Sequence, residues 1–137
     1  MKSGLIYLLA IVLLLTITLP LMAGFPGWVY TLRCDIKPGE YPNIINLKSN
    51  GVIAVAIFGN YHFNVEWIDP SSLWFEEAKA VKWSLADINF DGYMDLISHY
   101  RIKKTGIESG QEKAIIWWKL QNEDGWYCCS DDICTSF

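Results

Sequence analysis

One nine-residue segment, residues 87–95, carries oxygen donors at alternate positions. The donors are the side chains of Asp87, Asn89, Asp91 and Asp95 and the backbone carbonyl of Tyr93. Hard cations such as Ca²⁺ take about six to eight oxygen ligands, and a tight loop supplies them from alternate residues. Gly92 permits the sharp turn that such a loop needs. The spacing therefore predicts a calcium-binding loop, with Ca²⁺ as the cofactor of the protein.

The segment is not an EF-hand, and an ordinary polar turn is its alternative. An EF-hand has an acidic ligand at the twelfth position, where this chain has Ser98. The flanking residues 81–86 and 96–102 alternate in polarity, which predicts a strand on each side. Asp, Asn and Gly are also common in turns that bind no metal. The regular spacing of the oxygen ligands favours the metal site.

Short strand-like segments separated by turn signals make up the rest of the chain. The predicted strands are residues 29–36, 44–47, 52–58, 63–68, 81–86, 96–102, 114–120 and 126–128. Residues 52–58 are apolar at every position, which favours a strand buried on both sides. Residues 76–80 allow at most one helical turn, and no internal repeat suggests a propeller. The pattern predicts an all-β fold, an antiparallel β-sandwich.

An N-terminal hydrophobic segment, residues 1–24, precedes this domain. Lys2 is followed by an apolar run over residues 5–22, which is typical of a secretory signal peptide with cleavage after Ala23 or Gly24. If it stays uncleaved, the run is just long enough to act as a membrane anchor helix. In both cases we expect residues 25–137 to form one exported domain, secreted or at the cell surface. Contact with a membrane is expected only through residues 5–22.

The cysteines predict disulfide bonds. The chain has four, Cys34, Cys128, Cys129 and Cys134, and an even number in an exported chain favours pairing. Adjacent cysteines rarely bond to each other, so we expect Cys34 to pair with Cys128 or Cys129 and the other one to pair with Cys134. A four-cysteine zinc site is the alternative, but the spacing lacks paired C-x₂-C motifs.

Four residues are the candidate ligand face: Trp117, Trp118, His99 and Arg101. His99 and Arg101 share one side of their strand, and Tyr100 points to the other side. A catalytic His99 would need a partner nucleophile, and none is evident, so we interpret it as a structural histidine hydrogen-bonded beside the loop. The adjacent Glu76 and Glu77 are better explained by a solvated turn than by a pair of glycosidase carboxylates. No catalytic activity is therefore predicted.

Tryptophan is unusually frequent, with seven residues in the chain. Trp117 and Trp118 are neighbours on one strand, so one is expected in the core and the other nearer the surface. The simplest prediction places four others in the core, because buried aromatic area stabilises folding strongly: Trp67, Trp74, Trp83 and Trp126. Two or three tryptophans exposed together would instead form a platform for sugar rings.

Ten sequence blocks occur in one order along the first two thirds of the domain. They are D-I-K-P-G (35–39), P-N (42–43), I-N-L-K-S (45–49), G-V-I (51–53), V-A-I (55–57), D-P-S-S-L (69–73), D-I-N-F-D-G (87–92), D-L (95–96), H-Y-R (99–101) and T-G-I (105–107). In combination they resemble a module of secreted and cell-surface proteins of bacteria and archaea. The resemblance implies an exported β-domain with an acidic, Ca²⁺-binding loop and no activity that can be named. Tyr93 departs from the family, in which a further acidic residue is common there, and the Trp- and Cys-rich tail from Trp117 onward lies outside the resemblance.

The charge of the chain excludes one class of partner and leaves two classes of function. A formal net charge of −4 without any Lys/Arg cluster argues against nucleic-acid binding. The favoured function is an exported, Ca²⁺-stabilised binding or structural module without catalysis, whose partner is a protein or glycan at the cell surface. The alternative is a carbohydrate-binding or carbohydrate-active protein that uses surface tryptophans. Exposed, coplanar tryptophans would favour the sugar ligand, and buried tryptophans with an open sheet edge would favour protein assembly.

Overall fold

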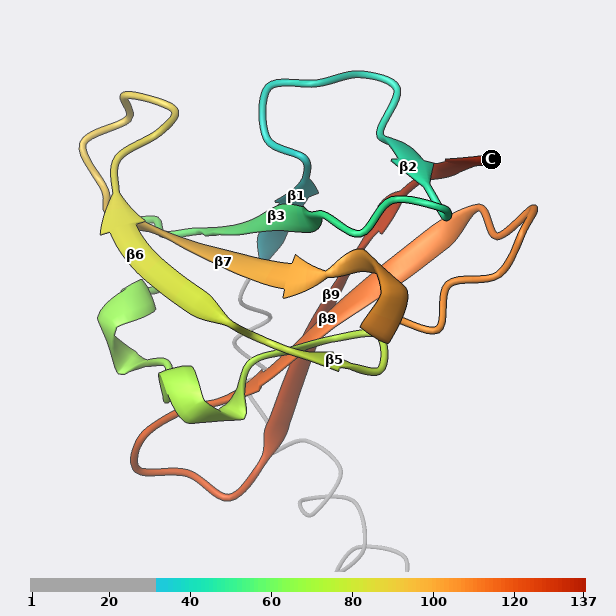
Figure 1. Ribbon diagram of the computed structural model, residues 1–137. Helices are drawn as coiled ribbons and strands as arrows, with labels where there is room; N and C mark the ends of the chain where they lie inside the picture. Colours follow the sequence, from blue (N-terminus) through green and yellow to red (C-terminus); the bar gives the residue numbers. More distant parts are fainter. Residues whose placement is uncertain (1–31) are drawn as a thin grey trace, which may run out of the picture.

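The computed structural model describes residues 32–137, so the predicted signal or anchor segment lies outside the described residues. This part of the chain is mostly β and its two larger sheets are antiparallel, which confirms the predicted all-β class (Figure 1). The strands are β1 (Arg33–Ile36), β2 (Ile44–Asn46), β3 (Val52–Phe58), β4 (Trp74–Phe75), β5 (Ala78–Lys79), β6 (Lys82–Ala86), β7 (Asp95–Arg101), β8 (Lys113–Lys119), β9 (Trp126–Asp132) and β10 (Cys134–Ser136). Three single-turn 3₁₀ helices accompany them, η1 (Val65–Trp67), η2 (Pro70–Ser72) and η3 (Ile102–Lys104). Between residues 32 and 137, no helix has the length and apolar character needed to cross a bilayer.

Two four-stranded sheets organise the fold. The first sheet has the strand order β1-β3-β7-β6, and the second sheet has the order β5-β4-β8-β9. A two-stranded parallel pair, β10 with β2, lies beside them. In the first sheet the register sets Ile57 opposite Leu96, and in the second it sets Trp117 opposite Cys128.

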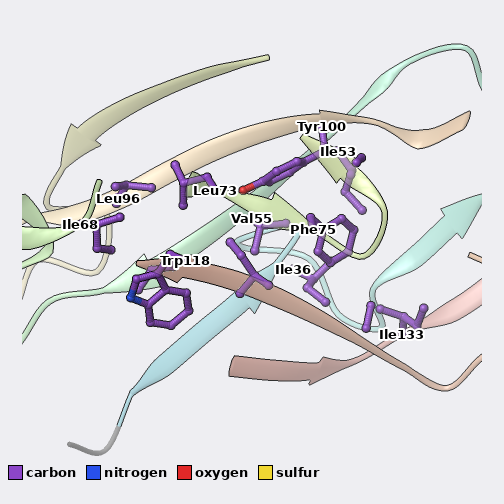
Figure 2. Close-up of a cluster of buried hydrophobic side chains, with 14 of the residues drawn as sticks. Ile36, Ile53, Val55, Ile68, Leu73, Phe75, Leu96, Tyr100, Trp118 and Ile133 are labelled. Carbon is purple, nitrogen blue, oxygen red and sulfur yellow. The ribbon is translucent and has the colours of Figure 1, made fainter. Parts of the chain in front are cut away.

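Both sheets contribute alternate side chains to one apolar core (Figure 2). Phe75 of the second sheet contacts Tyr100 of the first, with ring centroids 5.4 Å apart. Trp118 is fully buried and stacks on Tyr127 at 6.4 Å between ring centroids. Burial of a large apolar side chain contributes about 1.5–3 kcal/mol, so this core is the main stabilising feature of the domain.

One disulfide bond joins the edges of the two sheets. Cys34 of β1 is bonded to Cys129 of β9, which confirms the predicted link between Cys34 and the tail. Two hydrogen bonds add to this link, because Asp131 of β9 accepts the backbone N–H of Ile36 and the side-chain amide of Asn43, both at 3.0 Å. Strands β1 and β9 are therefore held together covalently and by hydrogen bonds.

The predicted second disulfide is wrong, because Cys128 and Cys134 are both unpaired and exposed. The β8–β9 ladder continues beyond Asp132 through the hydrogen bond from the N–H of Ile133 to the carbonyl of Glu112 at 2.9 Å. A strand rises about 3.3 Å per residue, so the Cα atoms of Cys128 and Ile133 lie roughly 16 Å apart. A disulfide requires a Cα–Cα distance below about 7 Å. The extended tail thus keeps the two thiols apart.

Three predicted elements differ from the structure. Residues 63–68 form η1 instead of a strand, because the side chain of Asn64 accepts the N–H of Glu66 at 3.0 Å and caps a helical turn. The last strand extends to Asp132 and is followed by β10, which pairs with the distant β2. Residues 76–80 contribute β5 in place of a helical turn.

Candidate functional site

The acidic loop of residues 87–94 connects β6 to β7 and is the yellow loop that projects from the first sheet in Figure 1. Asp87 accepts the backbone N–H groups of Asp91 and Gly92 at 3.2 and 2.9 Å. Asp91 in turn accepts the N–H of Tyr93 at 2.9 Å and the side-chain amide of Asn89 at 3.1 Å. Gly92 has a φ of 90°, which a side chain would strain. Asp87, Asn89 and Asp91 therefore gather around one tight turn, as the spacing predicted.

Asp95 lies at the base of this loop and is fully buried. Its two carboxylate oxygens accept the N–H of Gly59 at 3.1 Å and the N–H of Ile88 at 2.9 Å. Gly59 is required here, because a Cβ would stand 2.1 Å from the carbonyl oxygen of Met94. Burial raises the pKa of Asp95 above its usual range, and the nearby charges of Asp91 and Asp87 raise it further. Asp95 thus anchors the loop to the first sheet.

The chemistry of this loop suits a hard cation, although its carboxylates also serve the loop itself. Among residues 32–137, no group of three His, Cys, Asp or Glu side chains is placed to hold a metal ion. The side chain of Asn89 and the carbonyl of Tyr93 are oxygen donors outside those four residue types. Each carboxylate oxygen keeps a lone pair after it accepts one N–H. Asp87, Asn89 and Asp91 therefore offer oxygen donors of the kind that Ca²⁺ takes, but the described residues do not arrange them as a metal site.

A groove of about 500 Å³ runs beside the acidic loop on the first sheet. It is lined by Asp35, Pro38, Gly39, Ala54, Phe58, Ile88, Asn89 and Ile97. Burial raises the pKa of Asp35, and the charge of Asp131 raises it further. Residues from the D-I-K-P-G and D-I-N-F-D-G blocks, about fifty positions apart in the sequence, thus line the same groove.

The structure does not bring the predicted ligand face together. His99 and Arg101 lie on β7 of the first sheet, whereas Trp117 and Trp118 lie on β8 of the second. Arg101 is exposed and His99 is half-buried beside Ala54 and Lys82, its neighbours in the register. Burial lowers the pKa of His99, and Lys82 lowers it further. Its buried Nδ1 atom has no hydrogen-bond partner among the described residues, so the predicted structural hydrogen bond from this atom is not formed.

Trp117 and Trp118 alternate as predicted, but the prediction for the other tryptophans is wrong. Trp118 is fully buried and Trp117 is 38% exposed. The four tryptophans expected in the core are exposed by 37–53% of their surface: Trp67, Trp74, Trp83 and Trp126. In each of the strands β4, β8 and β9, strict alternation turns one tryptophan to the outer face, because its neighbour occupies the core.

Three of these tryptophans line one open hollow on the outer face of the second sheet. Trp74 of β4, Trp117 of β8 and Trp126 of β9 surround it together with Glu76, and its volume is about 420 Å³. Trp74 and Trp117 are direct cross-strand neighbours, and Trp126 lies opposite Lys119, two residues along β8. None of the three indole rings pairs with another aromatic ring of residues 32–137. The faces of Trp74 and Trp117 are therefore available to a ligand, whereas the Nζ of Lys119 lies 4.9 Å from the ring centroid of Trp126; we call this site the tryptophan hollow.

Glu76 is held in the tryptophan hollow by both its backbone and its side chain. Its N–H donates to the carbonyl of Ile115 at 2.9 Å, and its Oε1 accepts the N–H of Ile115 at 2.7 Å. Its φ of 50° is rare for a residue with a side chain. Glu77 is exposed and lies against Gly106, so the two adjacent carboxylates face apart, as expected. Glu76 thus presents one fixed carboxylate to the tryptophan hollow.

Sequence reasoning raised a platform of exposed tryptophans only as an alternative and did not predict which residues form the hollow, although one signal for it was present. In Leu73-Trp74-Phe75 and Trp117-Trp118, the core can take only alternate residues, so one member of each group must face outward. What the sequence does not provide is the register that sets Trp74 next to Trp117. No known family model, curated protein or solved structure matches this chain, so the geometry described above carries the functional argument.

Proposed function

We propose that the chain is an exported binding module without catalysis, and that the tryptophan hollow binds carbohydrate. The observation that carries this proposal is the convergence of three partly exposed tryptophans from adjacent strands around one hollow. Large exposed aromatic groups are costly in water, and grouped together they mark binding surfaces. A sugar ring has an apolar C–H face that packs on an indole and hydroxyl groups that bond to a carboxylate. Glu76 supplies that polar partner.

The arrangement of carboxyl groups supports binding over hydrolysis. Glycoside hydrolysis ordinarily uses two carboxyl groups that flank the scissile bond. Glu76 is the single carboxylate among the described residues that line the tryptophan hollow. We therefore assign the hollow a binding role.

Export is supported by the covalent chemistry of the domain. Disulfide bonds such as Cys34–Cys129 persist in oxidising compartments. The apolar residues 5–22, outside the described residues, are then the signal peptide or anchor helix, and the two packed sheets form the β-sandwich of a secreted or cell-surface protein. The resemblance to exported bacterial and archaeal modules agrees with this location.

The exposed edge of the first sheet favours a second candidate, a protein partner. Among the described strands, β6 pairs only with β7, and Val81 and Trp83 on this edge are about half exposed. Open edges of this kind accept an additional strand from another chain. This candidate becomes the better one if no glycan binds to the tryptophan hollow.

Binding of glycans by the full-length protein tests the proposed function. Oligosaccharide titration followed by calorimetry is expected to give saturable binding, and Trp117→Ala is expected to weaken it about tenfold or more, because a central aromatic contact dominates binding energy. Trp83→Ala is the matched control, since Trp83 is similarly exposed but lies on the first sheet. Equal losses in both variants, or no binding by the parent, would contradict the assignment.

We also propose that Ca²⁺ stabilises the acidic loop. The oxygens of Asp87, Asn89 and Asp91 would bind the ion. A bound cation would relieve the repulsion among the carboxylates that also raises the pKa of Asp95. We expect Ca²⁺ to raise the unfolding free energy by about 2.7 kcal/mol at a concentration of roughly a hundred times Kd. Thermal melts with Ca²⁺ and with chelator measure this difference.

Two substitutions show whether the calcium-dependent shift arises from the acidic loop or from another acidic site. Asp91→Asn keeps an oxygen for the N–H of Tyr93 but removes the charge, so it is expected to abolish most of the calcium-dependent shift. Asp124→Asn changes an exposed acid in the turn between β8 and β9 and is expected to leave the shift intact. An undiminished shift in Asp91→Asn would place the ion elsewhere.

A further inference from the structure

We infer that the tryptophan hollow is selective for glycans that carry positively charged amino groups, of the glucosamine class. This inference rests on the proposed carbohydrate binding and adds the charge of the ligand to it. Two features carry it, the position of the single carboxylate among the described lining residues and the open faces of the indole rings, and one feature limits it, a lysine of the protein at the edge of the hollow.

The first feature is the position of Glu76. It is the one charged residue among the four described residues that line the hollow. Its Oε1 accepts a hydrogen bond from the N–H of Ile115 at 2.7 Å, which holds the carboxylate against β8. No such bond from residues 32–137 occupies the second oxygen, Oε2. A group that enters between the tryptophans therefore meets a fixed negative charge.

The second feature is the aromatic lining. Indole faces carry the negative end of a quadrupole and attract ammonium groups within about 6 Å of the ring centroid. Trp74 and Trp117 provide two such faces around the same space, and Lys119 already lies over the third ring, that of Trp126. A cation in the hollow is thus attracted by the rings and by Glu76 together.

The feature that limits the binding of a cation is Lys119 at the rim. Its Nζ lies 4.9 Å from the ring centroid of Trp126, so this indole already holds an ammonium group. Lys79, opposite Trp74 in the register, is exposed and does not line the hollow. The positive charges therefore lie at the edge of the hollow, and the negative charge lies within it.

An amino sugar matches this arrangement better than a neutral sugar. Its C–H face packs on an indole as any pyranose does, and its ammonium group adds an ion pair with Glu76 and a cation–π contact. At solvent-exposed sites these two contacts together correspond to a preference of about tenfold over the neutral sugar. Lys119 competes for the same rings, so Lys119→Met is expected to widen the preference.

The test compares three β-1,4-linked trisaccharides, of glucosamine, N-acetylglucosamine and glucose, with the full-length protein at low ionic strength. We expect the glucosamine trisaccharide to bind about tenfold more tightly than the glucose trisaccharide by calorimetry. Glu76→Gln keeps an acceptor for Ile115 and removes the ion pair, so it is expected to reduce the preference to the few-fold that the cation–π contact alone supplies. Glu77→Gln changes the net charge equally but faces away from the hollow, and it is expected to retain the preference.

The possible outcomes distinguish a failure of the charge selectivity from a failure of carbohydrate binding itself. Equal binding of all three trisaccharides by the parent overturns the charge selectivity and leaves carbohydrate binding in place. Absence of binding by all three overturns both. A tenfold preference that survives in Glu76→Gln, or is lost in Glu77→Gln, overturns the assignment to Glu76, because the charge effect then arises elsewhere on the surface.

Discussion

Replacement of both Cys34 and Cys129 by serine is expected to lower the unfolding free energy by about 4–5 kcal/mol. The bond joins residues separated by 95 positions, and in the chain-entropy model the stabilisation grows with the length of the closed loop. Domains of this size are stable by about 5–15 kcal/mol in total. The variant is therefore expected to lose about a quarter or more of its stability, measured by urea denaturation without reductant.

The matched control replaces the other two cysteines. Cys128 and Cys134 are exposed and unpaired, so the double serine variant is expected to change the unfolding free energy by less than about 0.5 kcal/mol. A comparable loss in this control would mean that these two cysteines also stabilise the domain. An unchanged urea midpoint in Cys34→Ser/Cys129→Ser would show that the bond constrains the unfolded chain far less than the model requires.

The second prediction with a large expected effect is a difference in stability between variants of two adjacent tryptophans, Trp117 and Trp118. Trp118→Ala is expected to lower the unfolding free energy by about 3–5 kcal/mol, because it leaves a cavity between Phe63 and Tyr127 in the core. Trp117→Ala removes a partly exposed ring from the outer face and is expected to cost less than about 1 kcal/mol. Urea midpoints of the two variants measure the difference. Similar losses in both would contradict the observed alternation of β8.

The indole nitrogen of Trp118 leads to a further prediction about stability. The indole N–H of Trp118 is buried and has no hydrogen-bond partner among the described residues. An unpaired buried donor costs about 1–3 kcal/mol, which offsets part of the favourable burial of the ring. Trp118→Phe removes this donor while it keeps an aromatic ring, so its loss of stability is expected to be much smaller than that of Trp118→Ala.

Strand positions could be predicted where the local pattern alone decides them. Val52–Phe58 has the predicted bounds because a continuous run of apolar, β-branched residues suits a central strand. The acidic loop was also predictable, since its turn is determined by nearby Asp and Asn side chains that accept backbone N–H groups. In both cases the interactions involved are close in sequence.

The features that could not be predicted depend on contacts between distant residues. Strand β10 exists because Cys134–Ser136 pairs with Ile44–Asn46, and neither segment signals this partner. The tryptophan hollow depends on the register of β4, β8 and β9, which sets Trp74 beside Trp117. Hydrophobicity alone placed these rings in the core, whereas pairing between strands decides which face each one occupies.

The disulfide bond also determines how the domain would respond to mechanical force. Tension applied to the chain before Cys34 and after Cys129 passes directly through the covalent bond, so the intervening strands carry no load. Extension is then limited to the segment beyond Cys129, where β10 is held to β2 by a short parallel ladder. That ladder would separate first, while the tryptophan hollow stays shielded, because all of its described lining residues lie between the two bonded cysteines. If the domain is tethered at a surface, as we propose, tension would thus extend the C-terminal segment before it disrupts the tryptophan hollow.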